Sequence, residues 1–231
     1  EAHDANYVPI TGATGNPVGL LFNRKDTSKV YRLIGNVDVD YRMHFLPDLR
    51  FHATAGYDYS QGKGDIYVPA SAYQYYNSKG RDYSYGPQKN HNKLLTLYLN
   101  YNKEFKAIKS TLDVTAGYDY QFWKYTNAAF TEVNTLGENQ ATSAAADQRH
   151  ALLSYYGRVN FSFDSRYLLT ATVRRDGSSR FGKDNKWGTF PSFAASWRIT
   201  EEPFFKSETV SNLKLRASWG MTGNQEIGNY N

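Results

Sequence analysis

Apolar and polar residues alternate one by one along eight stretches of this chain. In residues 111–122, for example, Leu112 and Val114 alternate with Asp113 and Thr115. Successive side chains of a β-strand point to opposite faces, so this alternation predicts strands with one apolar and one polar face. The eight predicted strands are residues 31–42, 49–60, 95–102, 111–122, 153–163, 167–174, 192–199 and 213–220.

Most of these strands are long, and aromatic residues gather near the ends of their apolar faces. Soluble strands average about five or six residues, whereas a tilted strand that crosses a membrane needs about nine to eleven. Tyr118 and Phe122 end one face, and small Ala116 lies further in. A soluble β-sandwich also alternates, but its packed core gives no reason for aromatic ends. The pattern therefore favours an all-β, antiparallel transmembrane β-barrel.

The connections between the predicted strands alternate between short turns and longer polar segments. The short connections are residues 43–47, 104–108, 164–165 and the one after residue 199, and the long ones are 61–92, 123–150 and 176–187. Barrels of bacterial outer membranes have short periplasmic turns and long external loops. This parity places residues 1–29 and 222–231 on the external side. The chain is therefore expected to be a partial barrel, about eight strands of a larger wall.

Composition agrees with this interpretation. The mean hydropathy is −0.66, and no run approaches the 18 apolar residues of a transmembrane helix. Only half of each barrel strand faces lipid, so a barrel looks polar on average. The 20 Tyr residues suit aromatic girdles and polar-aromatic loops. Because there is no Cys, neither a disulfide nor a thiolate metal site is expected.

Two further signals limit the possible functions. No charged segment followed by an apolar run opens the chain, so no secretory signal is predicted, as expected of a mature exported protein or a fragment. The net charge is +5, but Lys and Arg are interleaved with Asp and Glu. Nucleic-acid binding usually needs a concentrated basic stripe, so it is not predicted.

Signals for catalysis are poor. His3, His44, His52, His91 and His150 are spread apart without the spacing of metal ligands. The sequence also lacks a nucleophile elbow, a phosphate-binding loop and a dinucleotide fingerprint. We therefore predict no enzyme activity, no catalytic residues, no cofactor and no metal.

Several long segments resemble a known family. RYLLTATVRRDGSSRFGKDNKWGTFPSFAASWRITEEPFFK (166–206) and NLKLRASWGMTGNQEIGNY (212–230) closely resemble the SusC/RagA family of TonB-dependent transporters of the Bacteroidetes outer membrane. LPDLRF (46–51), GYDYS (56–60) and SYYGRVNFSFDSRY (154–167) are similar to the same family. The resemblance covers nearly the whole chain and is weakest in the two longest polar segments.

The resemblance implies a large transporter with a plug domain, a TonB-contacting N-terminal box and a barrel of about 22 strands. Residues 1–231 are then expected to form part of one barrel domain, with the plug and the TonB box outside this chain. The implied partners are a SusD-like surface lipoprotein, TonB, an oligosaccharide or peptide substrate and outer-membrane lipid. Two alternatives remain open: a siderophore or cobalamin receptor of the same architecture, and a surface binding or adhesion barrel without transport.

The first candidate site is a tyrosine-rich segment. Phenol rings stack on sugars or peptide backbones and donate a hydrogen bond, so these residues are expected to contact substrate or the lid lipoprotein. Alternatively, they serve the folding and partner contacts of an external loop. The tyrosines are Tyr67, Tyr73, Tyr75, Tyr76, Tyr83 and Tyr85.

The second candidate is RRDGSSRFG, residues 174–182. Arg174 and Arg180 are candidate contacts because a guanidinium binds a carboxylate with two hydrogen bonds, in a substrate or in the plug. The favoured alternative is a structural loop, in which Gly177 supplies the turn and Asp176 pairs locally.

Overall fold

The structure is a computed structural model that describes residues 17–182, 185–207 and 209–225, and most of this chain is β-strand. None of the helices in these ranges is long and apolar enough to cross a membrane. The elements are α1 (Pro17–Phe22), β1 (Lys25–Arg42), β2 (Leu49–Val68), η1 (Tyr73–Tyr75), β3 (Arg81–Phe105), η2 (Lys106–Ile108), β4 (Ser110–Asn127), β5 (Phe130–Val133), β6 (Asn139–Ser143), β7 (Ala146–Phe163), β8 (Tyr167–Ser178), β9 (Trp187–Arg198), η3 (Ile199–Glu201) and β10 (Lys214–Gly220).

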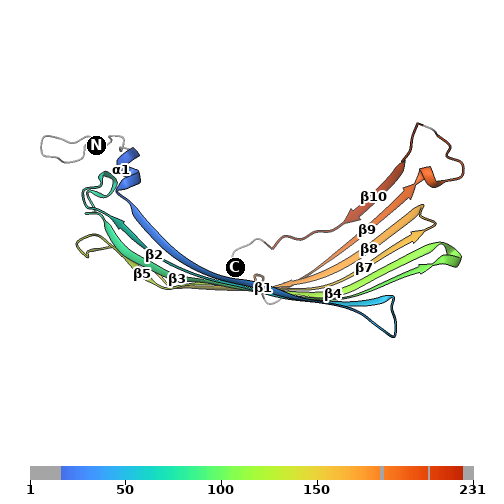
Figure 1. The fold of residues 1–231 in the computed structure, drawn as a ribbon, viewed down its shortest axis with the longest axis horizontal. Coiled ribbons are helices and arrows are strands. Elements are labelled where there is room, and N and C mark those ends of the chain that lie inside the picture. The colour runs from blue at the N-terminus through green and yellow to red at the C-terminus, as the bar shows by residue number, and fades with distance from the viewer. Residues whose placement is uncertain (1–16, 183–184, 208, 226–231) are drawn as a thin grey trace. The chain divides into compact units, whose positions relative to one another are not determined.

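Eight of the strands form one sheet in the order β1-β2-β3-β4-β7-β8-β9-β10, while β5 and β6 pair with each other. Each strand of the large sheet therefore lies beside its neighbour in sequence, with the β5–β6 hairpin inserted between β4 and β7. Figure 1 shows β7, β8, β9 and β10 following one another in this way. The predicted all-β, antiparallel fold of about eight strands is confirmed.

The described chain divides into two compact units. The first unit comprises residues 17–33, 58–91 and 124–148, and the second comprises 34–57, 92–123 and 149–225, apart from the undescribed positions. Each unit is treated by itself below. The first contains the tyrosine-rich segment, and the second contains Arg174 and Arg180.

The strand register of the second unit sorts side chains by face. One row of paired residues crosses four strands. It consists of Val159 on β7, Ala171 on β8, Phe193 on β9 and Trp219 on β10. Residues in register across neighbouring strands share a face. These strands therefore present a continuous apolar face, as the alternating pattern predicts.

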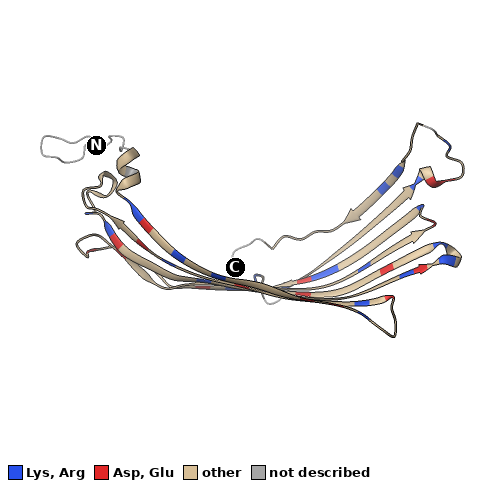
Figure 2. Ribbon diagram, in the orientation of Figure 1, with Lys and Arg blue, Asp and Glu red and all other residues tan. Residues whose placement is uncertain are grey.

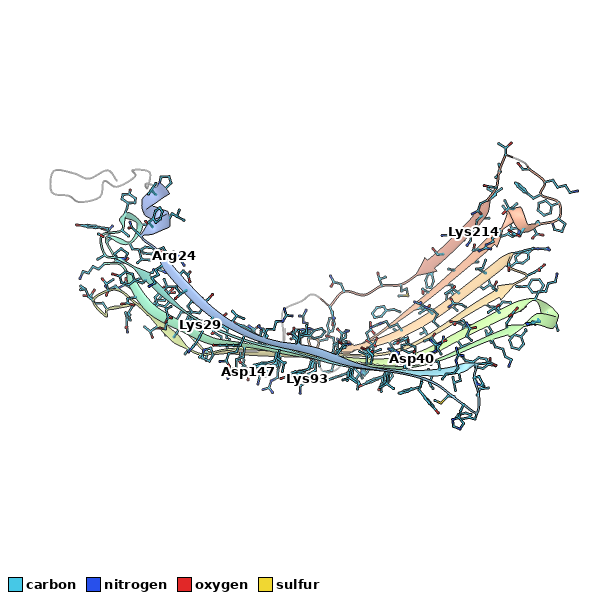
Figure 3. All side chains as sticks on the ribbon, viewed as in Figure 1. Arg24, Lys29, Asp40, Lys93, Asp147 and Lys214 are labelled. Atoms are coloured by element: carbon cyan, nitrogen blue, oxygen red, sulfur yellow. The ribbon has the colours of Figure 1, made fainter. Side chains whose placement is uncertain are left out.

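No second sheet of the described chain covers that apolar face. Leu169 is 52% exposed and Leu215 is 61% exposed, both within it. Figure 3 shows side chains leaving both faces of the sheet around β7 to β10. Within the described residues the buried hydrophobic core consists only of Ile66, Val68 and Ala72, all in the first unit. Within the described chain, apolar faces therefore do not bury one another as the two sheets of a β-sandwich do.

Aromatic residues end the apolar face of the second unit at both extremes. At the end of the strands where β8 connects to β9, which we call the long-loop end, the rings of Tyr155 and Trp187 stack with centroids 6.1 Å apart. At the opposite end, where β7 connects to β8, the centroids of the Trp197 and Phe204 rings lie 6.4 Å apart. Trp187 and Trp197 stand at opposite ends of β9, about 33 Å apart along the strand. In a barrel whose strands tilt by about 40°, that spans about 25 Å along the axis, the height of a lipid-facing band.

Polar side chains connect four strands on the opposite face. The amides of Asn100 and Asn102 on β3 donate to one carboxylate oxygen of Asp113 on β4, at 3.1 and 2.9 Å. The amide of Asn160 on β7 donates to the other oxygen at 3.3 Å. The hydroxyl of Thr170 on β8 donates to the Asn160 side-chain oxygen at 2.9 Å. Charges of both signs are interspersed along the strands (Figure 2).

The prediction of a long loop over residues 61–92 is wrong. β2 continues to Val68 and β3 already begins at Arg81, which leaves only residues 69–80 between them. Buried and exposed residues alternate strictly over the last six positions of β2. The segment therefore keeps the period of a strand, although its Gly, Lys and Tyr content is typical of a loop.

Two other predicted connections also differ. Within residues 123–150, β4 runs to Asn127, β7 starts at Ala146, and the β5–β6 hairpin lies between them. The connection after β9 is not short, because it includes η3 and extends over residues 199–213. Of the predicted external segments, residues 25–29 belong to β1, while 1–16 and 226–231 lie outside the described residues.

Candidate functional site

The six candidate tyrosines all lie in the first unit, around the connection between β2 and β3. Tyr67 is on β2, Tyr73 and Tyr75 are in η1, Tyr76 follows η1, and Tyr83 and Tyr85 are on β3. The structure thus gathers them where β2 and β3 meet at this connection, a part of the sheet that we call the ribbon.

Three of these tyrosines support the ribbon itself. Tyr75, Tyr83 and Tyr85 pack against the small hydrophobic core of the first unit. The Arg81 guanidinium lies 4.5 Å from the centre of the Tyr75 ring, close enough for a cation–π contact. These rings fill space within the unit, so their role in folding accounts for their presence.

The same residues attach the ribbon to the β5–β6 hairpin. Arg81 Nη1 lies 3.1 Å from Glu132 Oε2 of β5. The ring of Tyr83 stacks on Phe130 of β5, with centroids 6.0 Å apart and planes 7° from parallel. The ribbon and the hairpin therefore share an ion pair and an aromatic stack.

A second set of contacts ties the tip of the hairpin to the β2–β3 connection. The backbone amide of Thr135 donates to the carbonyl of Lys79 at 3.2 Å, and Lys79 Nζ lies 3.3 Å from Glu138 Oε1. The buried Asn134 side chain donates to Glu138 at 2.8 Å and accepts from the Glu138 backbone amide at 2.9 Å. Hydrogen bonds from Asn134 and Lys79 hold the pKa of Glu138 below its ordinary value.

Two of the tyrosines face outward. Tyr67 is 45% exposed and Tyr76 is 37% exposed. Tyr73 is half-buried. Exposed phenols beside a braced ribbon are suited to stacking on a ligand or partner, because the backbone that carries them is already ordered.

Arg174 lies on β8 in the second unit and is occupied by contacts within the chain. Its Nε donates to Asp176 Oδ1 at 2.7 Å and its Nη2 donates to the buried hydroxyl of Ser154 at 2.9 Å. Its Nη1 lies 3.7 Å from Asp119 Oδ2, and the guanidinium is 6.0 Å from the Tyr156 ring centre. The arrangement stabilises neighbouring strands and leaves little of the guanidinium for a ligand.

Asp176 pairs locally, as the structural interpretation of this segment predicts, but Gly177 does not supply a turn. Gly177 belongs to β8, which continues to Ser178. A Cβ at Gly177 would lie 2.9 Å from the Trp187 ring. The absence of a side chain therefore lets the indole cross the neighbouring strand closely.

Arg180 connects three segments of the second unit. Its Nη1 donates to the carbonyl of Gln225 at 3.1 Å, and its Nη2 lies 3.2 Å from His150 Nε2. The His150 ring stacks on Trp123 with centroids 4.6 Å apart. Arg180 Nε is buried without a hydrogen-bond partner among the described residues. Arg174 and Arg180 are thus both held by the chain, with separate sets of partners.

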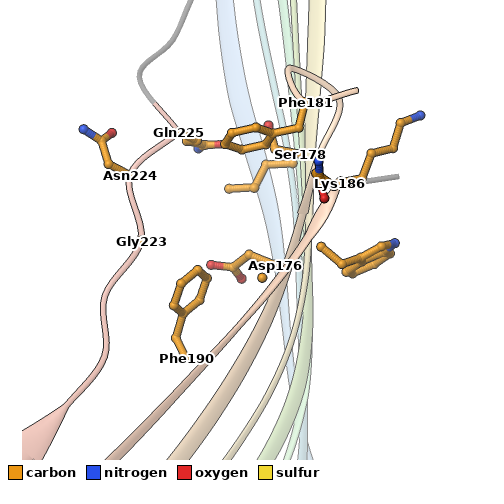
Figure 4. A pocket seen from close by; sticks show the side chains of 12 residues that line it. Asp176, Ser178, Phe181, Lys186, Phe190, Gly223, Asn224 and Gln225 are labelled. Atoms are coloured by element: carbon orange, nitrogen blue, oxygen red, sulfur yellow. The ribbon is translucent and has the colours of Figure 1, made fainter. Parts of the chain in front are cut away.

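A small cavity lies beside these arginines, between the ends of β8 and β9 and residues 223–225. Its volume is about 210 Å³. Asp176, Phe181, Phe190 and Gln225 are among the residues that line it, while the side chain of Lys186 runs away from it (Figure 4). It is smaller than most ligand pockets, which span about 300–1,000 Å³.

Sequence reasoning missed Glu202, a buried carboxylate in the connection after β9. It accepts from the Tyr167 hydroxyl at 2.6 Å, from Trp197 Nε1 at 2.9 Å and from Arg166 Nη1 at 3.2 Å. These contacts hold the pKa of Glu202 below its ordinary value, with the Tyr167 hydrogen bond as the largest cause. The signal available was weak: two adjacent Glu residues directly before Pro203.

No cluster of three or more His, Asp or Glu side chains suited to a metal ion occurs in the part of the chain that the structure describes. The predicted absence of a metal site concerns the whole protein and stays a prediction.

The fold defines a class of protein: an antiparallel meander of strands, whose apolar face in the second unit is exposed and bounded by aromatic residues, is typical of an outer-membrane barrel wall. The family described as "TonB dependent receptor-like, beta-barrel" matches residues 2–231. The chain therefore belongs to the TonB-dependent receptor β-barrel family.

Comparison with individual relatives narrows the family assignment further. The TonB-dependent receptor SusC of Bacteroides thetaiotaomicron is 38% identical over 97% of this chain, and the TonB-dependent receptor P39 of Formosa agariphila is 33% identical over 98%. The chain covers 23% of the length of each. The solved structure of the RagAB peptide transporter matches 96% of the chain with a TM-score of 0.81 at 23% identity, and the chain covers 26% of it. The resemblance to the SusC/RagA type is confirmed.

Proposed function

We propose that this chain is a section of the barrel wall of an outer-membrane transporter that takes up nutrients with energy delivered through TonB. The observation that carries the proposal is the 38% identity to SusC over 97% of the chain. The exposed apolar face with aromatic ends supports it, because such a face needs lipid to cover it.

The plug domain and the TonB-contacting box are proposed to lie elsewhere in the full-length protein. The chain spans about a quarter of the length of the curated relatives it matches. Residues 1–231 are proposed to belong to one barrel domain that supplies wall, rim and part of the ligand-facing vestibule. Chemistry on the substrate is not part of this role.

The proposed cargo is an oligosaccharide or a peptide, and the proposed partner is a SusD-like surface lipoprotein. Likeness to SusC in sequence and to RagAB in fold supports these two classes of cargo. Tyr67 and Tyr76 are the proposed contact residues because they are the exposed members of the tyrosine set. The other four, with Arg174 and Arg180, are proposed to support the surface rather than to bind.

Uptake by cells tests the function. A strain that lacks the full-length gene is compared with the same strain carrying it, using labelled oligosaccharides and labelled short peptides with and without a proton uncoupler. We expect the deletion to abolish accumulation of one of the two classes, and the uncoupler to abolish it in the complemented strain. The class that is lost identifies the cargo.

Three results would contradict the proposal. Loss of iron-chelate or cobalamin uptake alone would assign the protein to the alternative receptor type. Loss of cell adhesion with unchanged uptake would assign it to a binding barrel. Hydrolysis of the supplied substrate by the purified full-length protein would show an enzyme activity.

The tyrosine assignment needs its own variants. We expect the double variant Tyr67→Ala, Tyr76→Ala to weaken binding of the lipoprotein or the substrate about tenfold, since an aromatic contact contributes about 0.5–1.5 kcal/mol. Gln74→Ala, an exposed change in η1 between them, is the matched control. Calorimetric titration of the full-length protein with each partner measures the effect, and equal affinity in all forms would refute the assignment.

A further inference from the structure

Arg175 differs from its neighbour Arg174 in the face it occupies. The register pairs Arg175 with Tyr155 of β7 and Thr189 of β9. Tyr155 belongs to the apolar face at its long-loop end, so the Arg175 side chain stands on that face as well. Val173, two residues closer to the middle of the strand, is 50% exposed on the same face.

The guanidinium of Arg175 lies against an indole. Its central carbon is 5.4 Å from the Trp187 ring. Trp187 is 46% exposed and stacks in turn with Tyr155, which is 51% exposed. Stacking fixes the plane of the guanidinium while its N–H edge stays available for hydrogen bonds.

Arg175 lacks an anionic partner in the described part of the chain. Arg174 engages Asp176 and Asp119 on the opposite face, whereas Arg175 has no ion pair with any described carboxylate. Lys186, which directly precedes Trp187, is exposed and is likewise unpaired within these ranges. Among the described residues, the long-loop end of the apolar face therefore carries positive charge that no carboxylate pairs with.

We propose that Arg175, stacked on Trp187, binds the phosphate of a membrane-lipid headgroup at the long-loop edge of the apolar face. The proposal rests on the proposed membrane function. A guanidinium is costly at the centre of a bilayer but not near its interface, where Trp and Tyr side chains also gather. A phosphate is the anionic group found at that depth, and the planar fork of Arg matches it with two hydrogen bonds.

Lipid retention by the full-length protein tests this inference. The protein is reconstituted in nanodiscs of digalactosyl diacylglycerol, a bilayer lipid without phosphate, that contain a small fraction of diphosphorylated lipid A, and native mass spectrometry counts the lipid A molecules that remain bound. We expect Arg175→Gln to retain about tenfold less lipid A than the original protein, since a hydrogen bond to a charged group commonly contributes a factor of ten or more. Arg158 of β7 pairs with Thr172 on the polar face. Arg158→Gln removes the same charge from that face and is the matched control; it should retain lipid A normally.

Two further arms identify the ligand. Dephosphorylated lipid A should be retained equally poorly by all variants, and millimolar inorganic phosphate should not displace the phosphorylated form. Equal retention by Arg175→Gln and the original protein would overturn the inference, as would displacement by free phosphate. If the original protein did not enter nanodiscs at all, the proposed membrane function itself would fail.

Discussion

Two neighbouring residues, Arg174 and Arg175, show that the role of a side chain depends on the face of the sheet on which it lies. Arg174 stands on the polar face, where Ser154, Asp176 and Asp119 surround it. Arg175 stands on the apolar face against Trp187. The sequence contains the same side chain twice, and only the alternation of a strand separates a structural guanidinium from one with a free edge.

Replacing Arg174 with Gln should destabilise the barrel. The Ser154 hydroxyl would stay buried and lose its donor, and Asp176 would lose its 2.7 Å partner. Leaving buried polar groups unsatisfied costs about 1–3 kcal/mol. Unfolding of the full-length protein by guanidinium chloride in detergent, monitored by tryptophan fluorescence, measures the change in the free energy of unfolding. A variant with unchanged stability and reduced substrate affinity would instead show that Arg174 is a ligand contact.

Glu202→Gln should lower the melting temperature of the folded protein, and the effect should depend on pH. The carboxylate accepts hydrogen bonds from Tyr167, Trp197 and Arg166, and an amide oxygen replaces it poorly because these donors favour a negative charge. The turn that carries Glu202 lies outside the strands, so its folded pKa, lowered chiefly by Tyr167, is relevant to solution pH.

The direction of the pH effect follows from that lowered pKa. A carboxylate whose folded pKa lies below its unfolded value contributes stability above the unfolded value, and loses it as the pH falls through the folded pKa. The ordinary value is 4.5. We therefore expect the difference in melting temperature between the original protein and Glu202→Gln to be constant near pH 7 and to shrink below pH 4.5. A difference independent of pH down to pH 3 would assign the effect to shape rather than charge.

At the scale of elements, the first unit shows that a tyrosine-rich ribbon is braced by its neighbour. The β5–β6 hairpin contacts it through Glu132, Phe130 and Thr135. The backbone closes the β2–β3 connection with two left-handed residues, Lys79 at φ 60° and Gly80 at φ 78°. Because a side chain at the second position would meet backbone, the ribbon depends on this glycine.

Gly80→Ala should loosen the connection between β2 and β3. A Cβ at Gly80 would lie 2.4 Å from the Val68 carbonyl oxygen, and such backbone strain costs about 1–3 kcal/mol. Gly137→Ala is the matched control, because Gly137 also has a positive φ but no atom within 4 Å of a new Cβ. Its expected cost is only about 1 kcal/mol. Hydrogen exchange should accelerate at least tenfold over residues 69–80 in the first variant, and equal rates in both would refute the steric argument.

Sequence alone predicts those features of the elements that depend on neighbouring positions. Alternation at Val159, Asn160 and Phe161 is enough to assign faces, and the register of β7 with β8 confirms it. The contact of Arg174 with Asp119 depends instead on the pairing of separate strands, which no local pattern specifies. Glu202 likewise meets two of its three donors, Arg166 and Tyr167, only because the connection after β9 returns to the start of β8.

At the scale of the whole molecule, the two faces of the sheet in the second unit differ in polarity. Val159, Ala171 and Phe193 lie in register on the apolar face, while Asp113 and Asn160 belong to a hydrogen-bonded polar ladder. No described element covers the apolar face. If the protein works in a membrane, lipid must meet one face and water the other.

Adjacent arginine substitutions on β8 test this directly. Ala171 lies midway between Tyr167 and Arg175 on the apolar face, and Thr172 lies next to it on the polar face. Arginine at the lipid midplane costs about 2–4 kcal/mol, whereas a water-filled lumen accepts it. We expect Ala171→Arg to reduce the amount of folded, heat-modifiable full-length protein in the outer-membrane fraction severalfold, and Thr172→Arg to leave it nearly unchanged. Both changes add the same charge one residue apart, so a general sensitivity of β8 to charge would affect them equally. Only a sheet whose apolar side is shielded from water produces the asymmetry. Equal amounts of folded protein for the two variants would mean that water reaches both faces, which would contradict the membrane assignment.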